Sequence, residues 1–151
     1  MCKLTTKFAE SDTFTGYKAV IKHGDNYLSP ATGITYKIGK VPVLNSTTER
    51  DTSVIRGYSD KFKDFTSLAV VDFFKPEFNG KTAVFVKSMD AVEVSRTIAL
   101  DWCETELPLV IIKMTISGDL HRGTAAVNEF DHTGSHVVAG DTIVSIEEVT
   151  L

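Results

Sequence analysis

The sequence predicts a single small α+β domain, in which a mixed β-sheet carries one main helix on one face. The longest run of apolar and β-branched residues covers 109–117, starts after Pro108 and ends at Gly118. Its first four positions are apolar without alternation, as expected for a strand buried on both faces. A second observation is helical spacing of apolar residues over about 89–104. At 151 residues the chain has the size of one domain.

The first half of the chain predicts a β-meander after an irregular lead-in over 1–15. Three short segments, 17–22, 27–29 and 34–38, alternate apolar and polar residues or are rich in β-branched and aromatic residues. Glycine and proline-containing turns separate them at spacings of about ten residues. We therefore expect the folded domain to comprise 16–151.

The middle of the chain is the least regular part. Residues 45–57 have no apolar period and predict a long exposed loop. Residues 65–71 fit a short helix or a strand equally well, because periodicity cannot separate the two over so short a run. Asn79 and Gly80 then mark a turn directly before a predicted strand at 82–87.

One helix is predicted over about 89–104. Ser88 suits the N-cap, because its hydroxyl accepts a hydrogen bond from an amide of the first turn that has no partner within the helix. Asp90 places a negative charge near the positive end of the helix dipole. Apolar residues recur at spacings of three and four and predict one buried stripe, in which Trp102 is mostly buried. The stripe comprises Ala91, Val94, Ile98 and Trp102.

The order strand, helix, strand predicts a βαβ-like unit. Its two strands, 82–87 and 109–117, would run parallel with a right-handed crossover. The C-terminal part adds 136–139 and a last strand at 142–149. The predicted sheet therefore contains 17–22, 34–38, 82–87, 109–117 and 142–149, with the helix packed on one face.

Composition excludes several classes of protein. Hydrophobic residues make up 42% of the chain, far above the level of disordered proteins. The formal net charge of -4 argues against broad nucleic-acid binding, which needs a basic excess. No apolar segment is long enough to span a membrane, and the N-terminus lacks the pattern of a secretory signal. Cys2 and Cys103 form no metal or disulfide pattern, so we expect a soluble cytoplasmic protein with free thiols.

The last part of the chain gathers histidines and carboxylates, but the pattern does not predict a metal site. His132 and His136 have the spacing that converges on one ion in a helix. Residues 133–135 are turn-forming, so a helix is not expected there. No motif for a nucleotide or phosphate cofactor is present either, so we expect no cofactor and no metal.

A better interpretation of these side chains is the binding of a small anionic ligand. Arg122 is the first candidate, because guanidinium recognises phosphate or carboxylate through paired hydrogen bonds. Two long polar loops, 45–57 and 125–135, are expected at sheet ends, and the second brings His132 and His136 close to Arg122 in the sequence. If 17–22 and 34–38 pair, lysines of these strands would line one sheet edge. The candidate ligand-binding residues are Arg122, His121, His132, His136, Lys18, Lys37 and Lys40.

A cluster of three phenylalanines suggests an interface as the alternative to an anion-binding site. Phe73, Phe74 and Phe78 are close in the sequence and could form a surface that binds another protein or a second copy of the chain. Aromatic residues in a small domain are more often part of the core. The sequence leaves both interpretations open.

No complete catalytic constellation is present. The sequence has no Gly-x-Ser-x-Gly element, and Cys103 lies on the predicted helix. ADP-ribosyltransferases can be small mixed sheets that use a glutamate on a late strand. Here Glu147 and Glu148 are adjacent, so they should point to opposite faces of the sheet. The pattern therefore favours binding over catalysis.

Several short segments together resemble a diffuse group of small uncharacterised domains encoded by tailed bacteriophages and some bacteria. The likeness covers most of the chain from Gly16 onward and implies the order of the fold and a phage-type origin. It transfers no catalytic residues, because the matching positions are turns, caps and strands. They are Gly16-Tyr17-Lys18-Ala19, Tyr36-Lys37-Ile38-Gly39-Lys40, Ser88-Met89-Asp90-Ala91, Gly118-Asp119 and Ile143-Val144-Ser145-Ile146-Glu147-Glu148.

The leading hypothesis is a non-catalytic, phage-type accessory protein of the host cytoplasm. It would bind a host protein or a small anionic metabolite such as a nucleotide. One alternative is a small nucleotide-processing enzyme of the ADP-ribosyltransferase type. Another is a structural or decoration protein of the virion.

Overall fold

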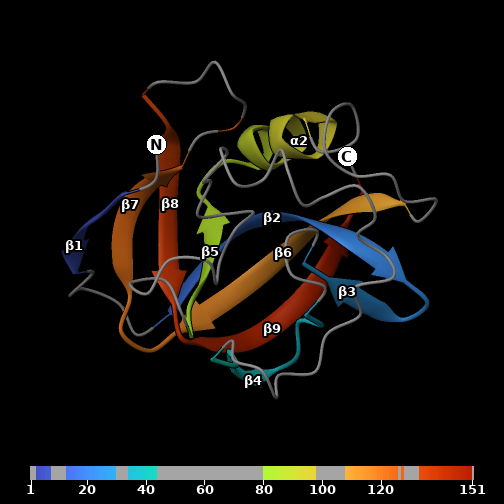
Figure 1. The fold of residues 1–151 in the computed structure, drawn as a ribbon, viewed down its shortest axis with the longest axis horizontal. Helices are drawn as coiled ribbons and strands as arrows, with labels where there is room; N and C mark the ends of the chain where they lie inside the picture. The colour runs from blue at the N-terminus through green and yellow to red at the C-terminus, as the bar shows by residue number, and fades with distance from the viewer. Residues whose placement is uncertain are drawn as a thin grey trace.

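The computed structural model describes residues 3–7, 13–29, 34–43, 80–97, 108–125, 127 and 133–150. Figure 1 shows that these residues form one large β-sheet with a helix packed against it. The strands are β1 (Lys3–Lys7), β2 (Thr13–His23), β3 (Asn26–Leu28), β4 (Gly39–Lys40), β5 (Thr82–Phe85), β6 (Leu109–Ser117), β7 (His121–Ala125), β8 (Ser135–Gly140) and β9 (Thr142–Val149). The helix is α2 (Ser88–Thr97).

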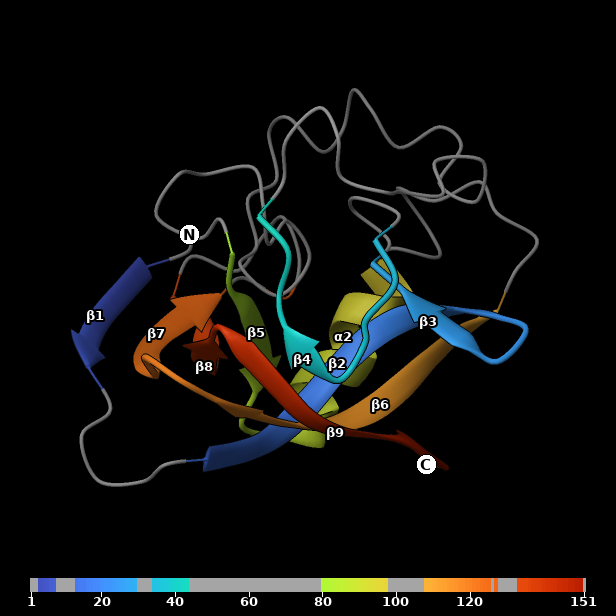
Figure 2. The ribbon, with the colours of Figure 1, turned by 90° about the horizontal axis from the view of Figure 1, so that it is seen from below.

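The strand order is β1-β7-β8-β5-β2-β6-β9-β4, with β3 paired to β2. Figure 2 shows the sheet curving, so that β1, β7 and β8 form one side of it and β3 lies at the other. Every pairing between the described strands is antiparallel, so the prediction of a mixed sheet is wrong for this part of the chain. β5 and β6 do run in the same direction, but β2 lies between them and pairs with both. The local order strand, helix, strand could not indicate that an earlier strand fills this place.

The centre of the sheet agrees with the sequence prediction. β6 and β9 have the predicted bounds, and β6 lies between β2 and β9. The β2–β6 ladder continues without a shift from Thr13 to Ile21, and Ile112, Met114 and Ile116 of β6 are fully buried. This apolar ladder explains why β-branched residues dominate both strands.

The first residues of the chain differ from the prediction. The irregular lead-in expected over 1–15 is wrong for 3–7, which form β1, and for 13–15, which begin β2. β1 is short and mostly polar, so its sequence shows no clear alternation of apolar and polar residues that would predict a strand. Its strand conformation depends on pairing with β7, which lies far along the sequence.

The strand predicted at 34–38 is also wrong. This segment makes an isolated bridge between Thr35 and Leu28, flanked by backbone hydrogen bonds from Ser29 N–H to the Ile34 carbonyl and from Tyr36 N–H to the Tyr27 carbonyl. It does not pair with β2, which pairs with β3 at this edge. Ile34 and Tyr36 are nevertheless buried, while Lys37 is exposed. The alternation that suggested a strand therefore reflects a segment that packs its apolar side chains onto the sheet and pairs with the end of β3 only briefly.

The sheet has two covered faces. On the first, which we call the core face, Val20, Val84 and Ile112 pack with Tyr36 and Val41 of the segment that crosses it. The opposite face, which we call the helix face, carries Ala19 and Phe85 and is covered by α2, which contacts β2, β5 and β6.

Helix α2 begins at Ser88, one residue before the predicted start at Met89. Ala91 and Val94 are buried, which confirms the part of the predicted stripe that the structure describes. Asp90 accepts a hydrogen bond from the Ser135 hydroxyl at 2.9 Å and so joins the start of the helix to β8. The rest of the predicted helix, including Trp102, lies outside the described residues.

Gly16 marks the closest approach between β2 and β5. A Cβ atom at this position would lie 2.5 Å from the carbonyl oxygen of Phe85 and 2.5 Å from Cγ2 of Val84. Both distances are far below van der Waals contact, so only glycine fits here. The two strands share a single registered pair, Tyr17 with Phe85, immediately beside this contact.

Candidate functional site

The register of the sheet decides which of the predicted ligand-binding residues share a face. Lys18 lies opposite Ile112, and Arg122 lies opposite Val138, whose side chain belongs to the core cluster. His136 is two residues from Val138 along β8 and therefore shares its face. Three of the predicted residues thus fall on the core face.

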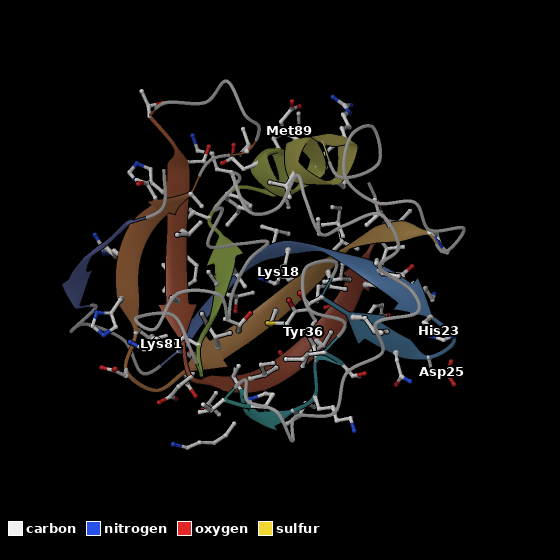
Figure 3. The ribbon with its side chains drawn as sticks, viewed as in Figure 1. Lys18, His23, Asp25, Tyr36, Lys81 and Met89 are labelled. Atoms are coloured by element: carbon white, nitrogen blue, oxygen red, sulfur yellow. The ribbon has the colours of Figure 1, made fainter. Side chains whose placement is uncertain are left out.

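The sequence suggested that Lys18 lines a sheet edge, and this prediction is wrong. β2 is a central strand, and the Lys18 side chain is fully buried. Its Nζ donates a hydrogen bond to the carbonyl oxygen of Ala83 at 2.9 Å. It also lies 5.5 Å from the centre of the Tyr36 ring, within the range of a cation–π interaction. Figure 3 shows Lys18 and Tyr36 near the middle of the sheet. The ammonium therefore joins β2 to β5 beside their short ladder.

Arg122 and His136 are the two candidates on the core face that reach solvent. Both side chains are exposed, and they lie on adjacent antiparallel strands. Arg122 pairs with Val138 and His136 pairs with Thr124, so the two basic residues are diagonal neighbours. Side chains in this arrangement are roughly 7–8 Å apart at their backbones, within reach of one bound anion. The structure therefore brings these two predicted residues together.

These residues belong to a larger basic region. Strands β1, β7 and β8 contain Lys3, Lys7, His121, Arg122 and His136 and no aspartate or glutamate. The whole chain has a formal net charge of -4, so its charges are unevenly distributed along the sheet. We call these three strands the basic end of the sheet.

His121 lies on the other side of β7. It pairs with Ala139 in the register and so faces away from Arg122. Its Nε2 is 3.2 Å from Oδ1 of Asp119, and Nζ of Lys81 is 3.3 Å from Oδ2 of the same carboxylate. The hydrogen bond from Lys81, with a further one from His121, holds the pKa of Asp119 below its ordinary value.

Asp119 also has an unusual backbone. Its φ of 41° lies in the left-handed region, which non-glycine residues rarely adopt, although aspartate is among those that do so more often. The preceding Gly118 also has a positive φ, and any side chain there would collide with Asp141. The tight turn between β6 and β7 thus positions the Asp119 carboxylate between its two partners. Of these three residues, the sequence had suggested only His121 as a candidate, and nothing in the sequence pointed to Lys81.

A second ionic group lies near the opposite end of the core face. Nζ of Lys22 is 2.8 Å from Oε1 of Glu148, which also accepts a hydrogen bond from the Tyr27 hydroxyl at 3.3 Å. The hydrogen bond and charge of Lys22 lower the pKa of Glu148, and Glu148 correspondingly raises the pKa of Lys22. Glu147 lies opposite Lys113 and Glu148 opposite Ile112, so the two glutamates face opposite sides, as predicted.

Other predicted residues stand apart from the basic end. Lys37 and Lys40 are exposed, and Lys40 belongs to β4 at the other edge of the sheet. The structure therefore does not bring the predicted ligand-binding set into one site. The remaining candidates, His132, Phe73, Phe74 and Phe78, lie outside the described residues.

Within the described ranges, no group of three histidine, cysteine, aspartate or glutamate side chains is arranged to hold a metal ion. No helix in this part of the chain is long and apolar enough to cross a membrane. Comparison with protein-family models, with curated proteins and with solved structures finds no match for this chain.

Proposed function

We propose that this protein is a phage-type accessory protein that acts by binding an anionic group at the basic end of its sheet. The observation that carries the proposal is the shared face of Arg122 and His136 on adjacent strands. Guanidinium and imidazole both donate hydrogen bonds to phosphate or carboxylate oxygens. The phage-type origin is supported by the sequence resemblance alone.

The binding group is built on regular structure. Arg122 and His136 lie on paired strands, and β8 also pairs with β5 in the centre of the sheet. Strands hold side chains more accurately than loops do, which favours recognition of a small group of fixed shape. We expect a ligand with a phosphate or a carboxylate, such as a nucleotide, and no chemical step.

The proposal is tested by calorimetric titration of the whole protein with inorganic pyrophosphate and with ADP. Arg122→Gln should weaken binding by roughly 10–100-fold, because a charge-assisted hydrogen bond is lost. Arg96→Gln is the matched control, since Arg96 is an exposed arginine near the end of α2, a helix that packs on β2, β5 and β6. Equal affinities for the two variants, or no binding by the unaltered protein, would disprove the proposal.

A second measurement separates binding from catalysis. We expect no transfer of label to protein when the chain is incubated with labelled NAD and a host lysate. Within the described residues, Glu148 is already paired with Lys22 and accepts the Tyr27 hydroxyl. Label transfer that Glu148→Gln abolishes would replace the binding proposal with the ADP-ribosyltransferase alternative.

A further inference from the structure

The register of β5, β8 and β7 adds two residues to the group formed by Arg122 and His136. Val86 directly follows β5, and its N–H donates a hydrogen bond to the carbonyl oxygen of His136 at 3.1 Å. This bond continues the β5–β8 ladder by one pair beyond Phe85. On the other side of β8, His136 lies opposite Thr124 of β7. Val86, His136 and Thr124 therefore form one row across three strands that lie side by side (Figure 1).

The members of this row lie on the core face. Val84, two residues before Val86, lies opposite Val138, and both valines belong to the core cluster. Side chains two residues apart on a strand share a face, so Val86 has the same orientation as Val84. Arg122 lies opposite Val138 and ends the neighbouring row of the same face. Two exposed basic side chains, a half-buried hydroxyl group and an exposed valine thus lie together.

Val86 gives the site an apolar side that an inorganic anion does not use. It is 42% exposed, whereas Val84 of the same segment is fully buried. A single exposed valine is ordinary on a protein surface. This one lies opposite His136, and residues paired in this way are about 5.5 Å apart at their Cα atoms. A ligand that accepts a hydrogen bond from His136 therefore also reaches the methyl groups of Val86.

The row is longer than one phosphate group. Neighbouring strands lie about 4.8 Å apart, so the row spans roughly 10 Å from β5 to β7. At its β7 end, the Thr124 hydroxyl can donate a hydrogen bond to an anion. A Cβ atom at Gly134 would lie 3.0 Å from Cβ of Thr124, so any side chain there would pack against the threonine. Glycine at this position leaves Thr124 half-exposed beside Arg122.

The charges of these strands suit an anionic ligand. β5, β7 and β8 contain no aspartate or glutamate. Asp90, which accepts a hydrogen bond from Ser135, belongs to α2, and α2 covers the opposite face of the sheet. An anion on the core face therefore meets no acidic side chain of the three strands that form the row.

We propose that the site selects anions that carry an apolar ring, with the anion held by Arg122, Thr124 and His136 and the ring packed on Val86. A mononucleotide combines these features, because every base has a flat aromatic face. The inference rests on the proposed function, since it names the ligand class of the same site. It assigns to Val86 the discrimination between nucleotides and inorganic phosphates. The formal net charge of -4 favours a free nucleotide over a nucleic-acid strand.

The test titrates the full chain with ADP and with pyrophosphate in a calorimeter. ADP should bind at least about fivefold more tightly, because packing on Val86 removes apolar surface from water. Val86→Ser should weaken ADP binding by about fivefold or more and pyrophosphate binding by less than about twofold. Val144→Ser is the matched control and should change neither affinity. Val144 is 44% exposed and lies on β9, which β2 and β6 separate from β5.

Three results would overturn the inference. The first is an equal effect of Val86→Ser and Val144→Ser on ADP binding, and the second is an equal loss of ADP and pyrophosphate binding in Val86→Ser. Methyl NMR of the unaltered protein gives the third reading without a variant. The Val86 methyl resonances should shift more with ADP than with pyrophosphate, and equal shifts would contradict the contact. Tighter binding of a 5′-phosphorylated oligoadenylate than of ADP would contradict a free nucleotide as the ligand.

Arg122→Gln distinguishes failure of this inference from failure of the proposed function. If it weakens binding of both ligands while Val86→Ser behaves like Val144→Ser, the contact with Val86 is wrong and the proposed function is retained. If Arg122→Gln leaves both affinities unchanged, the proposed function fails and this inference fails with it.

Discussion

The β2–β6 ladder and the β1–β7 ladder belong to the same sheet but differ in almost every physical property. The first continues without a shift and contains fully buried isoleucines, whereas the second is short and shifts its register between Leu4 and Thr6. The first is covered on both faces, while the second carries basic residues near the sheet margin. The difference teaches that buried apolar packing is concentrated in the centre of the sheet, so we expect the centre to contribute most of the stability.

Among the variants that test this contrast, Ile112→Ala should have the largest effect on stability. Ile112 is fully buried on the core face, so the truncation should cost about 2–5 kcal/mol in the free energy of unfolding. Ile38→Ala makes the same change at a side chain that is 71% exposed and should cost less than about 0.5 kcal/mol. Chemical denaturation measures both, and equal losses would show that the centre is not the stabilising region.

Gly16→Ala tests the contact between β2 and β5. The added methyl group meets a backbone oxygen that cannot rotate away, so we expect a loss of about 3 kcal/mol. Gly24→Ala is the control, because its Cβ would meet open space and only the positive φ is unfavourable. That variant should lose about 1 kcal/mol. A smaller loss at Gly16 than at Gly24 would mean that the strands can separate without penalty.

Lys18→Met tests the only lysine that is buried among the described residues. Methionine keeps most of the volume, but the carbonyl oxygen of Ala83 loses its donor. We expect a loss of about 1–3 kcal/mol in thermal or denaturant unfolding. Lys113→Met, at an exposed position on β6, should change stability by less than about 0.5 kcal/mol. Stabilisation by Lys18→Met would show that the apolar core face does not need the ammonium.

The smallest expected effect concerns the pH dependence of stability. Because the folded protein lowers the pKa of Glu148 below its ordinary value of 4.5, the carboxylate stabilises the fold above that value. This contribution is lost as the pH falls through the lowered pKa of the folded state.

Glu148→Gln should therefore make stability fall less steeply on acidification, as measured by urea midpoints between about pH 3 and pH 7. Glu147→Gln is the matched control on the opposite face of β9. An identical acid profile for Glu148→Gln and the unaltered protein would mean that Lys22 contributes nothing measurable.

The success and failure of the sequence predictions follow the same division of the sheet. The strands at 109–117 and 142–149 were predicted with correct bounds, because a long apolar or alternating run has few alternatives to a strand. β1 was missed, because a short polar strand at an edge depends on its partner for its conformation. The prediction of a full strand at 34–38 failed, because alternating apolar and polar residues indicate which side chains are buried. The pattern does not indicate which strand the backbone pairs with, or over what length.

The candidate site shows the same limit. The sequence put Arg122 and His136 in one candidate set, because they lie close together in the chain. It also grouped Lys18, Lys37 and Lys40 with them, whereas the structure buries the first and places the others away from the basic end. The sequence shows which side chains could bind an anion. Which of them share a face or an edge of the sheet follows only from the register of the strands.

The sequence by itself determined the central strands, the start of the helix and the absence of a familiar catalytic motif, because periodicity, capping and motif spacing are local properties. Only the tertiary structure decided that β2 separates β5 from β6, that Lys18 is enclosed, and that Lys81 meets Asp119. These are contacts between residues far apart in the chain, and they depend on strand order and register. A local sequence pattern limits the possible strand orders and registers but does not select one of them. Each antiparallel strand can satisfy its backbone hydrogen bonds with more than one neighbour.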